Sequence, residues 1–373
     1  MKSIDLSVYK SSKVYFIVFD CLLKNIDINK DVFLIDNDIA PSSYRRSRKE
    51  EQNIGPTIIE KLCDKLGYKT VSESLINELE KRFDEIYHSV YYKIYDSYEK
   101  DLEYLDKLID EKYIVFPIIS LFKLFLTMNN NVDANKNIET NYSYFLEVKK
   151  YKNFYLGDLE KIYTLLTIVF EEKAIDEAMS KKYDSGMAYY ALSSNLWRKK
   201  RYIEGLYFAK MGKEMFLKDC NYKRAFYINN NIMNCLASIG NYEECYELAW
   251  QEKRALKSLD IEGYLEKSAN HFIIISGIAL GKYKEVLELT NDCSIVTITI
   301  FIGILVSKYM IDKKSYEDHL SEVDFENIDN DIKNDIINID LFLKEKNKKY
   351  LSNLSWQVAI NLVQVLNKIV TQL

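Results

Sequence analysis

The chain has 373 residues, of which 48% are hydrophobic, so it is long enough for two or three domains with a sizeable core. Its formal net charge of −5 excludes a protein that is uniformly coated with cations for nucleic-acid binding. Residues 1–70 contain 12 basic and 10 acidic residues, so they are slightly basic while the remainder of the chain is acidic.

The first 70 residues predict four short helices. Apolar residues at helical spacing mark residues 12–25 and 31–38 as the first two. The third is expected to begin at Pro41, because proline and serine suit the first turn of a helix. Gly55 and Pro56 are expected to end it, and a fourth helix follows over residues 57–66.

This helix order resembles the helix-turn-helix of phage-repressor-like (Xre-type) regulators over residues 12–70. The resemblance is carried by Ile-Ala-Pro-Ser-Ser-Tyr-Arg-Arg, then Asn-Ile-Gly-Pro, then Ile-Ile-Glu-Lys-Leu-Cys-Asp-Lys-Leu-Gly, all within residues 39–67. The chain departs from the family in its second helix, which lacks the usual Gln, and in its first helix, which lacks the expected basic residues. The resemblance implies a helix-turn-helix DNA-binding domain over residues 1–70, with double-stranded DNA as partner.

The third helix would then be the recognition helix, which presents its N-terminal residues to base edges in the major groove. Arginine suits bidentate contact with guanine, and neighbouring cations hold phosphates. The candidate DNA-binding residues are Ser42, Ser43, Arg45, Arg46, Arg48 and Lys49. Tyr44 is expected to pack inward. The alternative interpretation is a solvated basic helix in an otherwise acidic protein.

Residues 71–110 predict one or two long amphipathic linker helices. Beyond them a short sequence motif recurs in which a tyrosine is expected to begin a helix. The successive tyrosines lie 40 and 41 residues apart, at Tyr202, Tyr242 and Tyr283. Such a period predicts a solenoid of stacked helix pairs, and the units resemble tetratricopeptide repeats. The expected fold is therefore all-α, with a tetratricopeptide-like domain over residues 111–373. The alternative is a set of ordinary antiparallel helix pairs with accidental similarity.

The end of the chain is unusually apolar. Residues 294–306 are too few to span a bilayer, so they predict a buried repeat helix and no membrane partner. Residues 356–373 are apolar on all sides, which predicts packing against two neighbours. A homodimer through these C-terminal helices is expected, since a helix-turn-helix usually reads two half-sites.

Asparagines cluster in the segment Tyr-Ile-Asn-Asn-Asn-Ile-Met-Asn-Cys at residues 227–235, although asparagine is a poor helix former. Matching the tetratricopeptide pattern places two of them on the face that such arrays turn toward their concave groove. A side-chain amide there can both donate to and accept from an extended peptide backbone. The candidate peptide-binding residues are Asn195, Asn230, Asn234, Asn270 and His271. The alternative is that these are exposed asparagines of an asparagine-rich chain.

Catalysis has little support in the sequence. The histidines, at positions 88, 271 and 319, match no metal motif, and no phosphate-binding glycine loop occurs. The six cysteines, at positions 21, 63, 220, 235, 245 and 293, lack metal-ligand spacing, so they are interpreted as reduced core thiols of a cytoplasmic protein. We therefore expect no enzymatic activity, no metal and no cofactor.

A helix-turn-helix followed by such an array resembles the peptide-pheromone-responsive regulators of Gram-positive bacteria and their phages (the Rgg, PlcR and PrgX type). The resemblance implies a transcription regulator that is gated by a short linear peptide in the concave groove. Two other interpretations remain open. One is a tetratricopeptide adaptor or Rap-like inhibitor that binds a protein and no DNA, and the other is a purely structural helical repeat.

Overall fold

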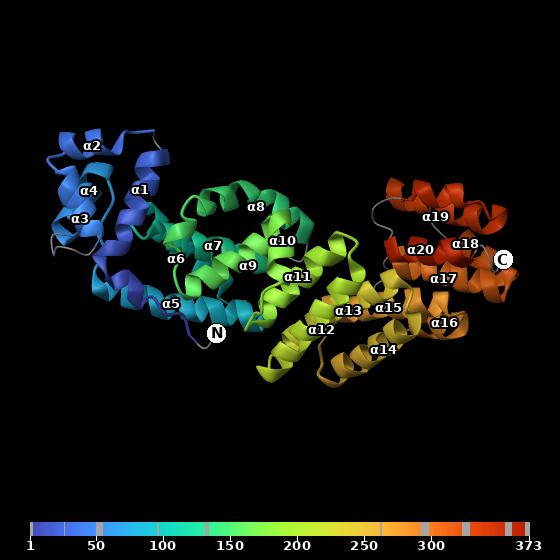
Figure 1. The fold of residues 1–373 in the computed structure, drawn as a ribbon. Coiled ribbons are helices and arrows are strands. Elements are labelled where there is room, and N and C mark those ends of the chain that lie inside the picture. The colour runs from blue at the N-terminus through green and yellow to red at the C-terminus, as the bar shows by residue number, and fades with distance from the viewer. Residues whose placement is uncertain are drawn as a thin grey trace. The chain divides into compact units, whose positions relative to one another are not determined.

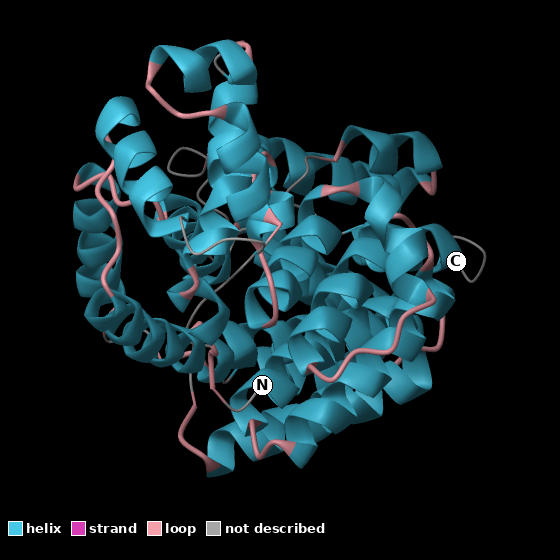
Figure 2. Cartoon of the chain, turned by 60° about the vertical axis from the view of Figure 1, so that its left-hand side comes forward, coloured by secondary structure: helices cyan, strands magenta, loops and turns pink. Residues whose placement is uncertain are grey.

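The computed structural model describes residues 3–25, 27–49, 55–94, 97–130, 134–261, 263–291, 298–322, 329–354 and 360–369. Within these ranges the regular structure is helical (Figure 2). An isolated β-bridge pairs Lys69 with Tyr113. The expected all-α class is confirmed for this part of the chain. The chain divides into two compact units, residues 1–192 and residues 193–373.

The first unit begins with four short helices, coloured blue in Figure 1: α1 (Tyr15–Asn25), α2 (Lys30–Asp36), α3 (Pro41–Arg48) and α4 (Gly55–Leu66). The side chain of Asn29 caps α2, accepting hydrogen bonds from the backbone N–H groups of its first turn. Asp38 adopts a left-handed φ of 56° in the turn before α3, which an aspartate tolerates better than most residues do. All four helices therefore lie close to where the sequence predicts them.

One boundary differs from the prediction. Gly55 and Pro56 form the first turn of α4 and do not end the preceding helix. Proline fits this position because the first N–H groups of a helix have no intrahelical acceptor, so the missing N–H costs nothing.

The N-terminal helices pack onto the rest of the first unit through Tyr9, which lies in the 3-10 helix η1 (Ser7–Lys10). The Tyr9 hydroxyl donates to the backbone carbonyl of Phe154 at 2.7 Å and accepts from the backbone N–H of Leu156 at 2.8 Å. The rings of Tyr9 and Phe154 meet edge to face with centroids 5.1 Å apart. Phe154 belongs to η3 (Lys152–Phe154), so this contact joins segments far apart in the sequence.

The remainder of the first unit is built around α7 (Phe116–Asn130), an apolar helix that packs against four others. These are α5 (Glu73–Tyr92), α6 (Tyr98–Asp110), α8 (Ala134–Lys149) and α9 (Asp158–Phe170). Phe122 of α7 stacks on Phe83 of α5 with centroids 4.0 Å apart, and both rings are fully buried. α5 and α6 are thus long amphipathic helices, as expected for residues 71–110, and α10 (Glu172–Met179) follows α9.

Consecutive helix pairs follow, and each tyrosine of the recurring motif begins a helix. The helices are α11 (Gly186–Arg198), α12 (Tyr202–Lys218), α13 (Tyr222–Ile239), α14 (Tyr242–Ser258), α15 (Tyr264–Ala279) and α16 (Tyr283–Asn291). Neighbouring helices pack in sequence order, α12 on α13 and α14 on α15. The predicted succession of helix pairs is therefore confirmed, and the packing is consistent with a helical repeat array.

Glycines allow close approach between these helices. A Cβ atom on Gly205 of α12 would lie 3.2 Å from the sulfur of Cys235 on α13. A Cβ atom on Gly303 would lie only 2.4 Å from the Cγ2 atom of Ile274 on α15. At Gly303 a methyl group would fit only if Ile274 moved, whereas at Gly205 the Cys235 side chain would have to give by a few tenths of an ångström.

The C-terminal helices close the second unit: α17 (Ile298–Ile311), α18 (Lys313–Ser321), α19 (Asn330–Glu345), η4 (Lys348–Asn353) and α20 (Ile360–Ile369). α17 packs on α15, α16, α18 and α19, as expected for the apolar run. No helix in the described ranges is long and apolar enough to cross a membrane. α20 packs on α13 and α15, and residues 356–359 and 370–373 of the predicted dimerisation segment lie outside the described residues.

The cysteines do not all behave as core thiols. Cys63, Cys235 and Cys245 are buried, and burial raises the pKa of each thiol to about 12. Cys220 is exposed, because it occupies the turn between α12 and α13 with a left-handed φ of 54°. The prediction was wrong for this residue, and Cys293 lies outside the described residues.

Candidate functional sites

The basic helix α3 divides cleanly into an inner and an outer side. Tyr44 and Ser47, three residues apart, are fully buried, which confirms the expectation for Tyr44. Five of the predicted DNA-binding residues are exposed: Ser42, Arg45, Arg46, Arg48 and Lys49. The sixth, Ser43, is half-buried. A helix with an inward tyrosine thus presents its cations to solvent.

Tyr44 fixes α3 against α1. Its ring meets the ring of Phe16 edge to face, with centroids 4.9 Å apart and an interplanar angle of 89°. Its hydroxyl donates to Oδ1 of Asp20 at 2.9 Å. Burial and the adjacent Asp20 carboxylate raise the pKa of the Tyr44 hydroxyl well above its ordinary value, so it remains a donor. A buried aromatic with a satisfied hydroxyl sets which side of α3 faces outward.

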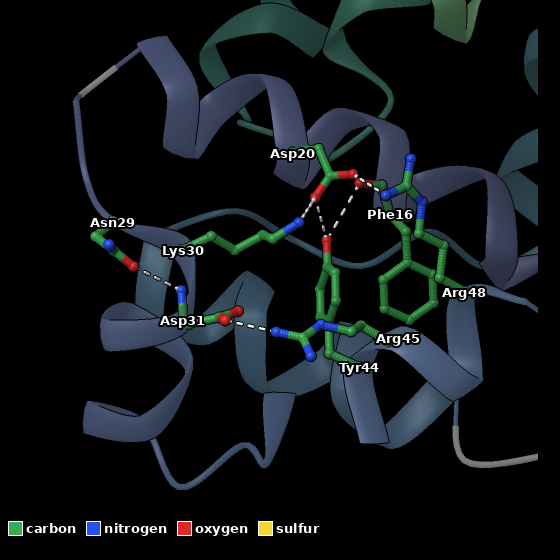
Figure 3. A network of polar contacts seen from close by, with 8 residues as sticks. All are labelled: Phe16, Asp20, Asn29, Lys30, Asp31, Tyr44, Arg45 and Arg48. Carbon is green, nitrogen blue, oxygen red and sulfur yellow. Dashed lines mark hydrogen bonds and ion pairs between the residues drawn. The ribbon is translucent and has the colours of Figure 1, made fainter. Parts of the chain in front are cut away.

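Asp20 is the centre of a small charge network that involves three helices (Figure 3). Besides its hydrogen bond with Tyr44, Asp20 forms two ion pairs. Nζ of Lys30 on α2 lies 3.3 Å from Oδ1, and Nη1 of Arg48 on α3 lies 2.8 Å from Oδ2. The carboxylate is mostly shielded, with 22% of its side chain exposed. One carboxylate between two cations leaves a net positive charge and ties α1, α2 and α3 together.

A second carboxylate engages the outer side of α3. Asp31 of α2 accepts from Nη2 of Arg45 at 2.5 Å, and both side chains are about half exposed. Such exposed ion pairs contribute only about 0–1 kcal/mol to stability. Arg46 and Lys49 have no ionic partner among the described residues. The predicted set therefore contains two arginines already paired with acidic side chains and two cations without an ionic partner in the described ranges.

Sequence reasoning missed both carboxylates. Asp20 and Arg48 are 28 residues apart, and Asp31 and Arg45 are 14 apart, so no local spacing rule joins them. The available signal is the acidic first turn of α2, which by itself indicates the start of a helix and no pairing.

The predicted peptide-binding asparagines lie on three successive helices. Asn195 on α11, Asn230 on α13 and Asn270 on α15 are each 5–7% exposed, whereas Asn234 and His271 are half-buried. The buried amides already have partners in the protein. The side-chain carbonyl of Asn230 accepts from the Ser268 hydroxyl at 2.8 Å, that of Asn270 from Lys253 at 2.9 Å and that of Asn195 from Arg198 at 3.1 Å.

Neutral hydrogen bonds join equivalent helices of neighbouring pairs. The Asn231 amide donates to the hydroxyls of Ser193 and Ser194, both at 2.8 Å, and links α13 to α11. The Trp197 indole donates to Ser238 at 3.2 Å across the same pair of helices. With Ser268 and Asn230 joining α15 to α13, these bonds form a polar ladder, defined here as the bonds among α11, α13 and α15. Much of the asparagine cluster therefore bridges the repeats.

Of the predicted set, Asn234 and His271 keep part of their side chains accessible. Desolvation lowers the pKa of the His271 imidazole to about 4, so the ring is neutral at neutral pH. A neutral ring and an amide can exchange hydrogen bonds with a peptide backbone without bringing a charge into the array.

The array also holds a buried acid that no sequence pattern indicates. Glu252 of α14 is 2% exposed, and neither carboxyl oxygen has a hydrogen-bond partner in the described ranges. Desolvation raises its pKa to about 8, and the nearby Asn229 amide and the Lys213 charge offset this only in part. The group is therefore largely protonated at neutral pH, which is how an unpaired buried carboxyl avoids a large desolvation cost.

Pockets lie elsewhere in both units. One of about 410 Å³ in the first unit is lined by α5, α9 and the start of α11, with Leu165, Tyr183 and Met187 among its walls. One of about 370 Å³ in the second unit lies among α12, α13 and α14. No group of three His, Cys, Asp or Glu side chains that could hold a metal occurs among the described residues.

The fold and its packing define an all-α protein of consecutive helix pairs, consistent with a helical repeat array. Comparison with protein-family models, with curated proteins and with solved structures finds no match to this chain.

Proposed function

We propose that the chain is a cytoplasmic DNA-binding transcription regulator whose repeat array binds a short linear peptide. The DNA-binding part of this proposal rests on the orientation of α3. Tyr44 is locked against α1, and Arg46 and Lys49 face solvent on the helix that follows the short turn from α2. Two short helices joined by such a turn are the arrangement in which helix-turn-helix proteins offer their second helix to the major groove.

The chemistry of α3 suits this role. Arg45 and Arg46 are the side chains proposed to reach base edges, where arginine pairs bidentately with guanine. Arg48 and Lys49, nearer the C-terminal end of the helix, are proposed to hold phosphates, together with Ser42 and Ser43. α3 would thus supply both the phosphate contacts that position the protein on DNA and the base contacts that recognise the sequence.

Two copies of the chain are proposed to bind together, because a helix-turn-helix usually reads two half-sites about one helical turn apart. The C-terminal helices are the proposed joint. One side of α20 is already buried by Leu362, Val365, Leu366 and Ile369 in packing on its own array. The half-buried side chains Val363, Gln364 and Asn367 are left to meet a second copy.

The peptide is proposed to bind beside the polar ladder. Asn234 and His271 are the accessible members of the predicted set, and Asn195, Asn230 and Asn270 shape the surface from beneath. An extended peptide has unpaired backbone groups that need such side-chain partners when they are buried. The peptide regulates DNA binding only if it prefers one arrangement of the array over another.

The DNA-binding part is tested by mapping the genomic DNA recovered with the protein and then measuring binding to a recovered site. Arg45→Ala with Arg46→Ala is expected to weaken site-specific binding by about 1–3 kcal/mol for each arginine–guanine pair removed, with an unchanged circular dichroism spectrum. Equal affinity of wild type and double variant for a mapped site would reject α3 as the recognition helix.

The peptide-binding part is tested by a thermal-shift screen of short synthetic peptides, followed by calorimetry on any that stabilise the protein. We expect Asn234→Ala and His271→Ala to weaken binding about tenfold, since each leaves a backbone group of the peptide unpaired. Wild-type affinity in both variants would move the peptide site elsewhere.

A second candidate is an adaptor or Rap-like inhibitor whose N-terminal helices bind a protein. It is favoured by the exposed apolar side chains Val32 and Ile35 of α2, at 53% and 62%, and by the pairing of Arg45 and Arg48 with carboxylates. Recovery of one protein partner whose binding is abolished by Val32→Ser with Ile35→Ser, without any recovered DNA, would favour this alternative.

A further inference from the structure

We propose that Asp31 is an electrostatic gate on α3, which holds Arg45 in an internal ion pair until a nucleic-acid phosphate or base replaces the carboxylate. The inference rests on the proposed DNA binding and adds a regulatory element to that site. Asp31 would lower the affinity of α3 for any DNA duplex. Only DNA sites that form strong contacts with the released Arg45 would then be bound well.

The two carboxylates beside α3 differ in a way that separates a structural from a gating role. Asp20 is mostly shielded, and it contacts Tyr44, Lys30 and Arg48 at once. Asp31 is 47% exposed, and Arg45 is its one ionic partner among the described residues. Asp20 therefore positions α3, whereas the Asp31 pair can open without disturbing the core.

Local structure explains why neighbouring residues face different partners. The Asn29 side chain accepts from the backbone N–H groups of Asp31 and Val32, which fixes the first turn of α2. In that turn Lys30 extends to Asp20, and Asp31 extends to Arg45 (Figure 3). The capped turn thus sets the gate beside the exposed side of the proposed recognition helix.

Arg45 remains paired with an anion when a phosphate replaces the Asp31 carboxylate. An exposed carboxylate–guanidinium pair contributes little, because water and salt screen it. Arginine binds phosphate in the same planar, bidentate manner as carboxylate, so a phosphate oxygen can take the place of Asp31. The released carboxylate then lies near the duplex and repels it, so Asp31 opposes binding both by holding Arg45 and by its own charge.

The test measures binding of a fluorescent mixed-sequence DNA duplex by anisotropy between roughly 50 and 200 mM salt. Asp31→Asn is compared with Asp36→Asn, which removes the same charge from the same helix at an exposed residue with no partner in the described ranges. Arg45→Ala and the double variant Asp31→Asn/Arg45→Ala complete the cycle. Circular dichroism and thermal unfolding verify that every variant is folded.

We expect Asp31→Asn to tighten binding about threefold to fivefold, the range of an exposed ion pair, and Asp36→Asn to have a smaller effect. In the Arg45→Ala background the gain should fall to the small effect of charge removal that Asp36→Asn measures. Equal gains from Asp31→Asn and Asp36→Asn, or an undiminished gain from Asp31→Asn in the Arg45→Ala background, would overturn the gate while DNA binding stands. Folded wild type and Asp31→Asn that bind no duplex at any salt concentration would overturn both proposals.

Discussion

On α3 the charged side chains lie at the surface and two of them pair with carboxylates, whereas on α11, α13 and α15 the polar side chains are largely neutral amides and hydroxyls placed between helices. Asp31 and Arg45 remain about half exposed, while Asn230 is 5% exposed and bonded to Ser268. Both sets are candidates for ligand contact in the sequence. Only the charged set keeps most of its binding groups accessible.

Accessibility, and not residue type, decides which polar groups can contact a ligand. An exposed ion pair exchanges partners at little cost, since screening already weakens it. A buried amide that loses its partner leaves an unsatisfied group, which costs about 1–3 kcal/mol. Changes on α3 should therefore alter binding, and changes within the array should first alter stability.

The largest effect is expected inside the array, at the contact of α20 with α13 and α15. Leu366→Ala removes a fully buried side chain and should lower the free energy of unfolding by about 2–5 kcal/mol. Val363→Ala, on the half-buried side of the same helix, should cost much less. Urea unfolding followed by circular dichroism measures both, and equal stability of Leu366→Ala and wild type would mean that α20 is not seated on the array.

The buried carboxyl of Glu252 should make the stability of the protein depend on pH, unlike the exposed ion pairs of α3. The pKa of Glu252 is raised to about 8, so the folded protein keeps a proton that the unfolded chain loses above about pH 4.5. The stability contribution of this group is therefore complete below pH 4.5 and is lost as the pH rises toward 8, at about 1.4 kcal/mol per pH unit. Glu252→Gln should remove this slope and stabilise the protein at pH 8 by roughly 4 kcal/mol.

The matched control is Glu247→Gln, which changes an exposed glutamate of the same helix and should leave the pH slope intact. Urea unfolding at pH 5 and pH 8 gives the slope for each variant. If wild type and Glu252→Gln lose stability equally between these pH values, Glu252 is not a buried carboxyl that stays protonated in the folded protein.

The polar ladder should show a smaller, cooperative effect. Asn230→Ala leaves the Ser268 hydroxyl without its acceptor and should cost about 1–3 kcal/mol of stability. Ser268→Ala should cost a similar amount, and the double variant should cost less than the two together because they share one bond. Strict additivity in unfolding free energies would show that Asn230 and Ser268 act independently, and would reopen the ligand role of Asn230.

The contrast also explains what the sequence could and could not reveal. Helices beginning at Tyr202, Tyr242 and Tyr283, and the inward side of Tyr44, follow from local spacing, so periodicity is enough to predict them. The pairing of Asp31 with Arg45 depends on how separate helices pack, which no local pattern encodes. The same holds for the hydrogen bonds of the ladder, because the two side chains in each bond lie 37–41 residues apart.

The most direct test of DNA binding by α3 is the salt dependence of duplex binding for wild type and Lys49→Ala, with Arg254→Ala as control. Lys49, proposed to hold a phosphate, is exposed without an ionic partner among the described residues, and Arg254 is an exposed arginine on α14 in the other unit. For wild type the logarithm of the binding constant should fall linearly with the logarithm of the salt concentration. Lys49→Ala should reduce that slope by about 1, and Arg254→Ala should leave it unchanged. Identical slopes for wild type and Lys49→Ala, or no binding by the folded wild type, would contradict DNA binding by α3.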